Sequence, residues 1–192
     1  MPNLYIIAGC NGAGKTTASY TVLPEILNCK EFINADEIAK GLSPFQPETV
    51  SIQAGRIMLN RINELLNSKA SFAFETTLSS KSYVNTVKEA QEAGYIVSLV
   101  YFWLNTVDLA IERVGIRVKE GGHNIPEDIV RRRYKLGIRN LFERFIPIVN
   151  YWMVFDNSRD SSVLIAEGDK SESSTIYNES IWNEIKSIAN GR

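Results

Sequence analysis

Near its amino terminus the chain reads Gly9-Cys10-Asn11-Gly12-Ala13-Gly14-Lys15-Thr16, which fits the pattern G-x-x-x-x-G-K-[ST] at every specified position. In loops of this kind the glycines let several backbone N–H groups converge on one anion, and the helix that follows adds the positive end of its dipole. Lys15 supplies a full positive charge for the β- and γ-phosphates, and the Thr16 hydroxyl can bind Mg²⁺. The stretch therefore predicts a nucleotide phosphate site.

The flanking residues provide the strand-loop-helix context that this motif requires. Residues 4–8 are a short apolar run, typical of a buried parallel strand. Residues 16–23 can continue as a helix that ends at Pro24. The candidate nucleotide-binding residues of the loop are Gly9, Asn11, Gly12, Ala13, Gly14, Lys15, Thr16 and Thr17, with Thr16 as the candidate magnesium ligand.

Length and composition bound the remaining possibilities. The 192 residues suit a single domain with a sizeable core. The formal net charge is -1, and no block of like charge suggests a nucleic-acid surface. No apolar run reaches the ~18 residues of a membrane span, and the first predicted strand begins too close to Met1 for a signal peptide. We therefore expect a cytoplasmic protein that binds neither nucleic acid nor membranes.

Acidic residues follow two further predicted strands. Residues 31–34 read as a strand with Asp36 just beyond it, and residues 70–74 read as another that leads into Glu75. In open α/β sheets, ligands bind beyond the carboxyl ends of the strands, at the edge that also carries the phosphate loop. Asp36 is then the N-cap of a short helix, a group that faces the substrate, or both. Glu75 is expected to be a site carboxylate rather than an exposed loop acid.

Strands and helices alternate along the chain. Beyond the strands already named, apolar runs indicate strands over residues 95–104 and 151–155 and a small one over 163–166, and helical patterns cover 47–67, 81–93, 106–120, a stretch from 126 and finally 175–189. This alternation predicts one α/β domain, 1–192, with a doubly wound, mostly parallel five-stranded sheet and helices on both of its faces.

Two of the predicted helices flank a Gly-Gly joint. The first carries Arg113 and Arg117, which lie four residues apart on one face. After the joint at Gly121-Gly122, the second helix carries Arg131, Arg132 and Arg133. A helix pair of this kind, over about residues 107–135, can close as a lid that brings cations to phosphates. At least one of these arginines is expected to be catalytic, because guanidinium offsets the charge that spreads over a transferring phosphoryl group.

Two other positions lie near the expected site. The strand over 151–155 ends in Asp156-Asn157-Ser158, at the edge where a nucleotide base could rest, so Asn157 is a candidate nucleotide contact. The sole histidine, His123, has no second imidazole or cysteine with which to build a metal site, and we expect it to order the joint rather than to act as an acid or base.

Together these stretches resemble the zeta-toxin family of P-loop kinases, in particular its stand-alone bacterial branch. The matching stretches occur in the family's order over most of the chain and are Gly9 to Thr17, Ile33-Asn34-Ala35-Asp36, Phe74-Glu75-Thr76-Thr77-Leu78, Arg113 to Arg117 followed by Gly121-Gly122-His123-Asn124-Ile125-Pro126, and Asp156-Asn157-Ser158. The phosphate loop is common to many families, whereas Phe-Glu-Thr-Thr and Gly-Gly-His-x-Ile-Pro are discriminating. The resemblance implies a P-loop kinase-like fold with a helical lid.

The resemblance also implies a kinase that uses ATP and Mg²⁺. By position, Asp36 resembles the general base that takes the proton from the acceptor hydroxyl, and Glu75 resembles the acid that helps to hold the acceptor. Arg117 with Arg131 or Arg132 resembles the lid arginines that stabilise the transferring phosphoryl group. The candidate catalytic residues are Asp36, Lys15, Arg117, Arg131 and Arg132, and the candidate substrate-binding residues are Asp36, Glu75, Thr76 and Arg113.

Toxins of this family phosphorylate a sugar hydroxyl of UDP-N-acetylglucosamine and are held inactive by a small helical antitoxin, so both are expected partners by resemblance. Two alternatives remain open. One is a kinase for another metabolite, of the gluconate or shikimate kinase type. The other is a P-loop ATPase or nucleotide switch, against which the chain shows neither an Asn-Lys-x-Asp motif nor an apolar strand ending in an Asp-Glu pair.

Overall fold

The order of the strands determines where the predicted motifs meet. The computed structural model describes residues 1–122, 124–171 and 173–191, and these residues form a seven-stranded sheet with the order β2-β3-β1-β4-β5-β6-β7. Strands β1 to β5 are parallel, and β6 and β7 extend the sheet antiparallel. The strands are β1 (Asn3–Gly9), β2 (Phe32–Ile33), β3 (Phe72–Thr76), β4 (Ile96–Trp103), β5 (Tyr151–Asp156), β6 (Val163–Asp169) and β7 (Ser174–Ile176).

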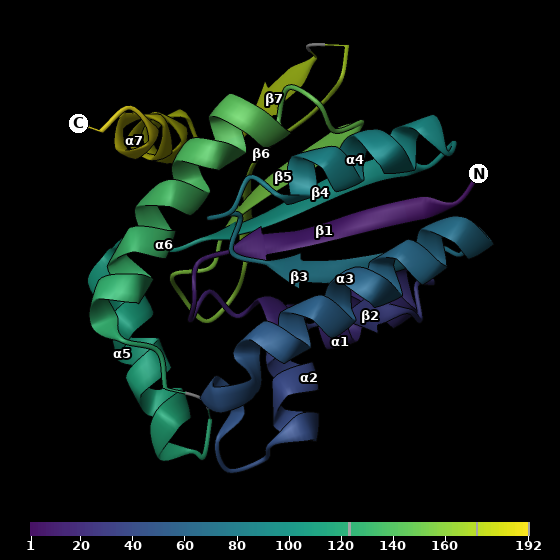
Figure 1. The fold of residues 1–192 in the computed structure, drawn as a ribbon. Helices are drawn as coiled ribbons and strands as arrows, with labels where there is room; N and C mark the ends of the chain where they lie inside the picture. Colours follow the sequence, from purple (N-terminus) through teal and green to yellow (C-terminus); the bar gives the residue numbers. More distant parts are fainter. Residues whose placement is uncertain (123, 172, 192) are drawn as a thin grey trace.

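Helices connect the parallel strands and cover the sheet (Figure 1). They are α1 (Lys15–Thr21), α2 (Ala35–Leu42), α3 (Ser51–Ser68), α4 (Tyr83–Glu92), α5 (Val107–Lys119), α6 (Glu127–Asn140) and α7 (Glu179–Ala189), with shorter turns η1 (Val22–Ile26), η2 (Pro47–Val50) and η3 (Leu141–Phe145). Among the described helices, none has the length and apolar character that crossing a membrane requires.

The direction of each connection places its helix on one face of the sheet. The chain crosses the sheet in one direction from β1 to β2, and in the opposite direction through β3, β4 and β5. Because such crossovers are right-handed, α1 covers one face while α3, α4 and α6 cover the other. Figure 1 shows α5 and α6 beside the carboxyl end of β1, which is the end that carries the phosphate loop.

Strand β4 forms the centre of the sheet because it is apolar along most of its length. Its neighbours are β1 on one side and β5 on the other. Val97, Leu99, Tyr101 and Trp103 are buried and alternate along the strand, so they lie on one face. The strand predicted over residues 95–104 is thus β4.

The predicted α/β class and mostly parallel sheet are confirmed, but the sheet has seven strands instead of five. The small strand predicted over 163–166 continues to Asp169 as β6. Strand β7 was not predicted, and the final helix begins at Glu179 instead of residue 175. Asn178 fixes that start, because its side chain accepts a hydrogen bond from the Ile181 backbone N–H at 3.1 Å.

Helix α7 is attached to the sheet through aromatic stacking. Trp182 of α7 lies parallel to Trp152 of β5, with ring centroids 5.5 Å apart and an interplanar angle of 5°. Phe142 packs against the same ring of Trp182 at 5.0 Å. Trp182 is buried, so its indole supplies much of the apolar contact of α7.

We therefore expect Trp182→Ala to lower the free energy of unfolding by about 3–5 kcal/mol, through lost burial and the cavity left behind. Trp182→Phe should lower the free energy of unfolding by less than the alanine variant does, because it keeps an aromatic ring against Trp152. Urea denaturation followed by circular dichroism measures both changes. A loss below about 1 kcal/mol for the alanine variant would mean that α7 contributes little to the cooperative core.

Candidate active site

The phosphate loop runs from the end of β1 into α1. Two of its glycines are required because neighbouring atoms leave no space for a side chain. Gly14 is the N-cap residue of α1 in the left-handed conformation, with φ 78° and ψ 13°. A Cβ at Gly14 would lie 2.6 Å from the amide nitrogen of Asn157. A Cβ at Gly12 would lie 2.7 Å from the carbonyl oxygen of Ala110. The loop is thus held between the end of β5 and helix α5, with no room for a side chain at either glycine.

Asn157, the candidate nucleotide contact, is bonded to the loop itself. Its Nδ2 donates to the carbonyl oxygen of Ala13 at 2.7 Å, and its Oδ1 accepts from the Ser162 hydroxyl at 2.6 Å. Arg113 fixes the same segment, because its guanidinium donates to the carbonyl oxygens of Asn157 at 2.8 Å and Ser158 at 3.1 Å. In this structure Asn157 holds the end of β5 against the phosphate loop, and Arg113 ties the same segment to α5.

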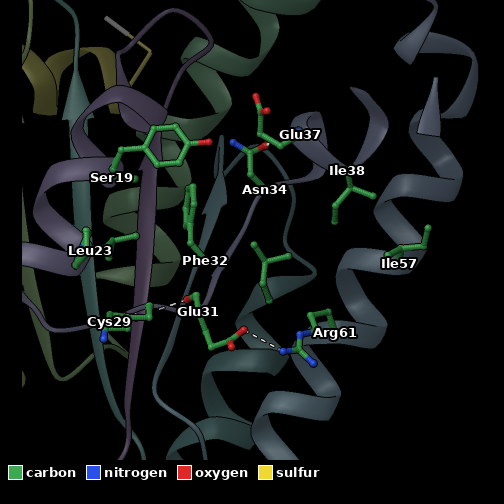
Figure 2. Close-up of a pocket in the computed structure, with 14 residues that line it drawn as sticks. Ser19, Leu23, Cys29, Glu31, Phe32, Asn34, Glu37, Ile38, Ile57 and Arg61 are labelled. Carbon is green, nitrogen blue, oxygen red and sulfur yellow. Dashed lines mark hydrogen bonds and ion pairs between the residues drawn. The ribbon is translucent and has the colours of Figure 1, made fainter. Parts of the chain in front are cut away.

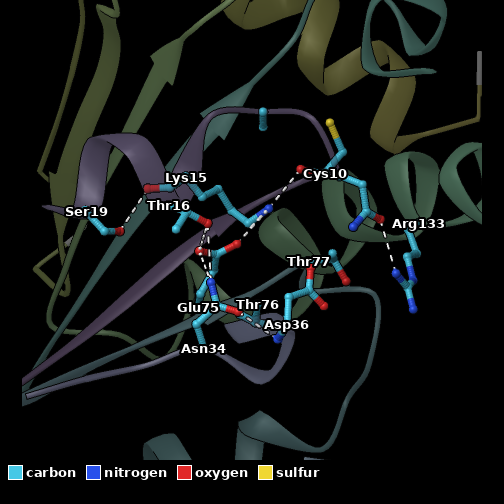
Figure 3. A network of polar contacts seen from close by, with 12 residues as sticks. Cys10, Lys15, Thr16, Ser19, Asn34, Asp36, Glu75, Thr76, Thr77 and Arg133 are labelled. Atoms are coloured by element: carbon cyan, nitrogen blue, oxygen red, sulfur yellow. Dashed lines mark hydrogen bonds and ion pairs between the residues drawn. The ribbon is translucent and has the colours of Figure 1, made fainter. Parts of the chain in front are cut away.

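Glu75 lies at the centre of a buried polar network (Figure 3). Its Oε1 is 3.3 Å from Lys15 Nζ, which also donates to the carbonyl oxygen of Cys10 at 2.9 Å. Its Oε2 accepts from the Thr16 hydroxyl at 2.7 Å. Lys15 is 5% exposed and the Glu75 side chain 12%. The carboxylate predicted to hold the acceptor therefore lies directly on the lysine and threonine of the phosphate loop.

This arrangement fits a magnesium ion bound together with nucleotide phosphates. The Thr16 hydroxyl donates a hydrogen bond to Glu75, so its oxygen keeps a lone pair for a cation. A nearby carboxylate can hold water molecules of the ion, and Mg²⁺ usually keeps several of these beside phosphate oxygens. Thr16 and Glu75 line the same cavity, so both can take part.

The N-cap of α2 is Asn34, so the alternative that made Asp36 the cap is wrong. The Asn34 side chain accepts from the backbone N–H groups of Asp36 at 2.8 Å and Glu37 at 3.4 Å. Asn34 has the extended backbone that a cap requires, whereas Asp36 already lies in the first turn. The carboxylate of Asp36 is consequently available to the site, which was the other predicted role.

Two cavities meet at these side chains. One, of about 280 Å³, is lined by the phosphate loop together with Arg113, Ile116, Arg117 and Glu120 of α5. The other, of about 240 Å³, is rich in hydroxyl groups, and its lining includes Thr76, Thr77, Ser79, Ser80 and Tyr83. The residues that line both cavities are Asn11, Lys15, Asp36 and Glu75. Asp36 thus lies where a phosphate held in the first cavity and a hydroxyl held in the second would meet.

Arg117 approaches this junction from α5. Its Nη1 is 4.0 Å from Oδ2 of Asp36, and it lines the phosphate-loop cavity. The site therefore places a guanidinium beside the candidate base, on the side of the loop. His123, which follows in the predicted joint, lies outside the described residues.

The three arginines of α6 have different surroundings. Arg131 is bonded at the surface to Glu127 at 2.7 Å and Asp108 at 2.8 Å. Arg132 is exposed, and neither residue lines the two cavities. Arg133 lines the hydroxyl-rich cavity, and its Nη1 donates to Oδ1 of Asn11 in the phosphate loop at 3.2 Å. Burial lowers the pKa of Arg133, while the charge of Asp36 opposes that shift.

Sequence periodicity could have narrowed the choice among these arginines. The buried stripe of α6 contains Val130, Tyr134 and Ile138. At 100° per residue, Arg132 lies opposite this stripe, while Arg131 and Arg133 lie on its two flanks. Which flank faces the phosphate loop depends on how α6 packs, and that is not encoded in the local pattern.

Cys10 is a buried part of the loop. Burial raises the pKa of its thiol to about 11, so the group stays protonated and unreactive at neutral pH. Its carbonyl oxygen, which accepts from Lys15, matters more to the site than its sulfur.

A larger cavity, of about 830 Å³, lies at the β2 edge among α1, α2 and α3 (Figure 2). Its lining is mainly apolar and includes Leu23, Phe32 and Ile38. At its rim Arg61 Nη2 is 2.9 Å from Oε2 of Glu31. Lys15, Asp36 and Glu75 do not line it, so the chemistry of the described residues converges in the two smaller cavities.

Comparison with known proteins agrees with this geometry. The family model described as Zeta toxin matches residues 1–179. An uncharacterized protein of Haemophilus influenzae is 36% identical over 126 residues, which cover 66% of this chain and 88% of that protein.

Among solved structures, the crystal structure of AvrRxo1-ORF1:-ORF2 with ATP aligns with a TM-score of 0.77 and 20% identity, covering 98% of this chain and 64% of that chain. This chain thus spans less than two thirds of that relative. A structure of the PezAT chromosomal toxin-antitoxin system of Streptococcus pneumoniae aligns with a TM-score of 0.66 and 18% identity, covering 100% of this chain and 80% of that one. These likenesses show a shared fold. Because the family model covers most of its length, the chain belongs to the zeta toxin family.

Proposed function

We propose that this chain is a kinase that uses ATP and Mg²⁺ to phosphorylate a hydroxyl group of a small molecule. The observation that carries the proposal is the position of Asp36, which lines both the phosphate-loop cavity and the hydroxyl-rich cavity. The ATP-bound relative of the same fold supports the choice of nucleotide. Family membership supports a phosphotransferase over a nucleotide switch.

In this mechanism the residues of the chain position the reactants and offset charge. Lys15 and the loop N–H groups bind the β- and γ-phosphates. Asp36 accepts the proton of the acceptor hydroxyl as its oxygen bonds to the γ-phosphorus, and the bond from that phosphorus to the β,γ-bridging oxygen breaks to release ADP. Arg117 and Arg133 offset the charge that spreads over the transferring group. Mg²⁺, held through Thr16 and Glu75, would neutralise phosphate oxygens.

We assign the acceptor to the hydroxyl-rich cavity, with a UDP-N-acetyl sugar such as UDP-N-acetylglucosamine as the favoured acceptor. The side chains of Thr76, Thr77, Ser79 and Ser80 offer donors and acceptors that suit a sugar. The identity of the sugar nucleotide rests on family membership. A simple sugar acid is the alternative acceptor, and the two differ in whether uridine is required.

The first prediction is that the protein transfers label from γ-labelled ATP and Mg²⁺ to UDP-N-acetylglucosamine, and that Asp36→Asn lowers this transfer by about 100-fold or more. ATP binding should change little in the variant, because Asp36 serves the acceptor. Chromatography of the products over a panel of UDP-sugars and sugar acids measures the transfer. If only a sugar acid became labelled, the acceptor would be a sugar acid and not a UDP-sugar. If the label appeared only as free phosphate, the result would favour an ATPase.

A second prediction separates the arginines of α6. Arg133→Ala should lower turnover by about 100-fold or more, because the residue lies at the phosphate loop. Arg131→Ala is the matched control and should change turnover by less than about threefold, since its guanidinium pairs with surface carboxylates. Steady-state kinetics of both variants decides the assignment. The opposite ranking would return the catalytic role to Arg131, which is one of the two positions, with Arg132, that the sequence resemblance implies.

A third prediction concerns the biological role. If the acceptor is the UDP-sugar pool of bacteria, expression of the wild-type chain should arrest growth, whereas Asp36→Asn should be harmless at the same protein level. Growth curves with immunoblotting measure both. A harmless wild-type chain would favour a housekeeping metabolite kinase, without an antitoxin. Growth arrest would justify a search for a small helical antitoxin among proteins that co-purify with the chain.

A further inference from the structure

Asn34 joins three separate segments of the site through one buried amide. Its Oδ1 accepts from the backbone N–H groups of Asp36 and Glu37, in the first turn of α2. Its Nδ2 donates to Oε2 of Glu75 at 2.9 Å and to the Thr16 hydroxyl oxygen at 3.3 Å. Asn34 is 7% exposed. A single side chain therefore links the phosphate loop, the end of β3 and the start of α2 (Figure 3).

The chemistry of the partners fixes the orientation of this amide. Backbone N–H groups can donate but cannot accept, so they must face the amide oxygen. The carboxylate of Glu75 can accept but cannot donate, so it must face the amide nitrogen. The reversed orientation would place like groups against each other at both ends.

Asparagine is the residue that satisfies both ends at this position. Aspartate would keep the cap but lose the N–H donors and bring a second negative charge toward Glu75. Serine would also cap the helix, but its short hydroxyl cannot serve the cap and reach Glu75 together. An N-cap alone would thus tolerate several residue types, whereas the observed contacts require a group with an acceptor and donors.

The position of Asp36 is set more by its backbone contact with Asn34 than by its side-chain contact with Arg117. Its backbone N–H lies 2.8 Å from Oδ1 of Asn34, whereas its carboxylate lies 4.0 Å from Nη1 of Arg117, which is beyond hydrogen-bond distance. The location of the carboxylate thus follows from the start of α2, and that start is tied through Asn34 to Thr16 and Glu75.

We propose that Asn34 is a positioning residue that couples Thr16 and Glu75, where phosphates and Mg²⁺ are expected, to the turn of α2 that carries Asp36. The inference rests on the proposed function, because it takes Asp36 as the group that receives the acceptor proton. Nucleotide binding fixes Thr16 and Glu75, these hold the amide of Asn34, and the amide holds the first turn of α2. Bound phosphates would make these contacts open less often, so the base is held most firmly when the phosphate loop is loaded.

Hydrogen exchange tests the coupling without any acceptor. The probe is the non-hydrolysable ATP analogue with a β,γ-imido group, added with Mg²⁺ to the full chain. In the wild type it should slow exchange in peptides covering 35–42 by about threefold or more, since the first turn opens less often. Peptides covering 179–189, in α7, serve as the internal reference and should respond less.

The informative variant is Asn34→Ser, which keeps a cap but loses the link. Asn178→Ser is its matched control, because Asn178 caps α7 through Ile181 and takes no part in the site. Asn34→Ser should bind the analogue within about threefold of the wild type and melt close to the control, yet lose the slowing over 35–42 and about 100-fold in turnover. Asn34→Asp, which also keeps the cap and lacks the donors, is the second variant if the serine variant is unstable.

Distinct outcomes separate failure of this inference from failure of the proposed function. A wild-type chain that does not bind the analogue contradicts the nucleotide site itself. Binding without any slowing over 35–42 overturns the coupling, as does an Asn34→Ser variant that keeps both the slowing and the turnover. A variant that loses binding as severely as Lys15→Ala would make Asn34 a nucleotide-binding residue, which also overturns the positioning role.

Discussion

The buried pair between Lys15 and Glu75 is the interaction on which the rest of the site depends. A lysine ammonium that is 5% exposed needs a compensating charge, since an unpaired buried cation is costly. Glu75 supplies that charge at 3.3 Å because β3 lies directly beside β1, with Ile7 opposite Glu75 in the parallel register. The strand order is therefore a condition for the chemistry, and a shift of one residue would turn the carboxylate away from the loop.

The same pair explains how so many polar groups can be buried together. Glu75 accepts from Thr16 and Asn34 as well as pairing with Lys15, so its two oxygens are used by three partners. A network with every member satisfied adds rigidity, whereas a partly satisfied one would destabilise the core. The ends of β1 and β3 and the start of α2 are consequently joined in one arrangement, which is the kind of preorganisation that phosphoryl transfer needs.

How far the sequence predicts this site depends on how local each feature is. The phosphate loop and the acids after two strands were predictable, because motif and strand end are adjacent in the chain. The pairing of Glu75 with Lys15 was not predictable, because it depends on β3 lying beside β1. The cap at Asn34 is a local feature that the sequence could have shown, whereas its contact with Glu75 depends on β2 pairing with β3. Arg133 was one of several candidate arginines, and its place at the loop depends on how α6 packs. Strand β7 was missed because its three residues form a strand through pairing with β6 and not through an apolar run.

The positions of the cations follow from the helix pair that carries them. Arg113 is bound by the carbonyl oxygens at the end of β5, so it stabilises the wall of the site. Arg117 on α5 lies beside Asp36, and Arg133 on α6 contacts Asn11. Because these two guanidiniums stand on different helices, the packing of α5 against α6 sets the distance from both of them to a bound phosphate. A phosphate bound in the loop would therefore be flanked by one guanidinium from α5 and one from α6, next to the network around Glu75.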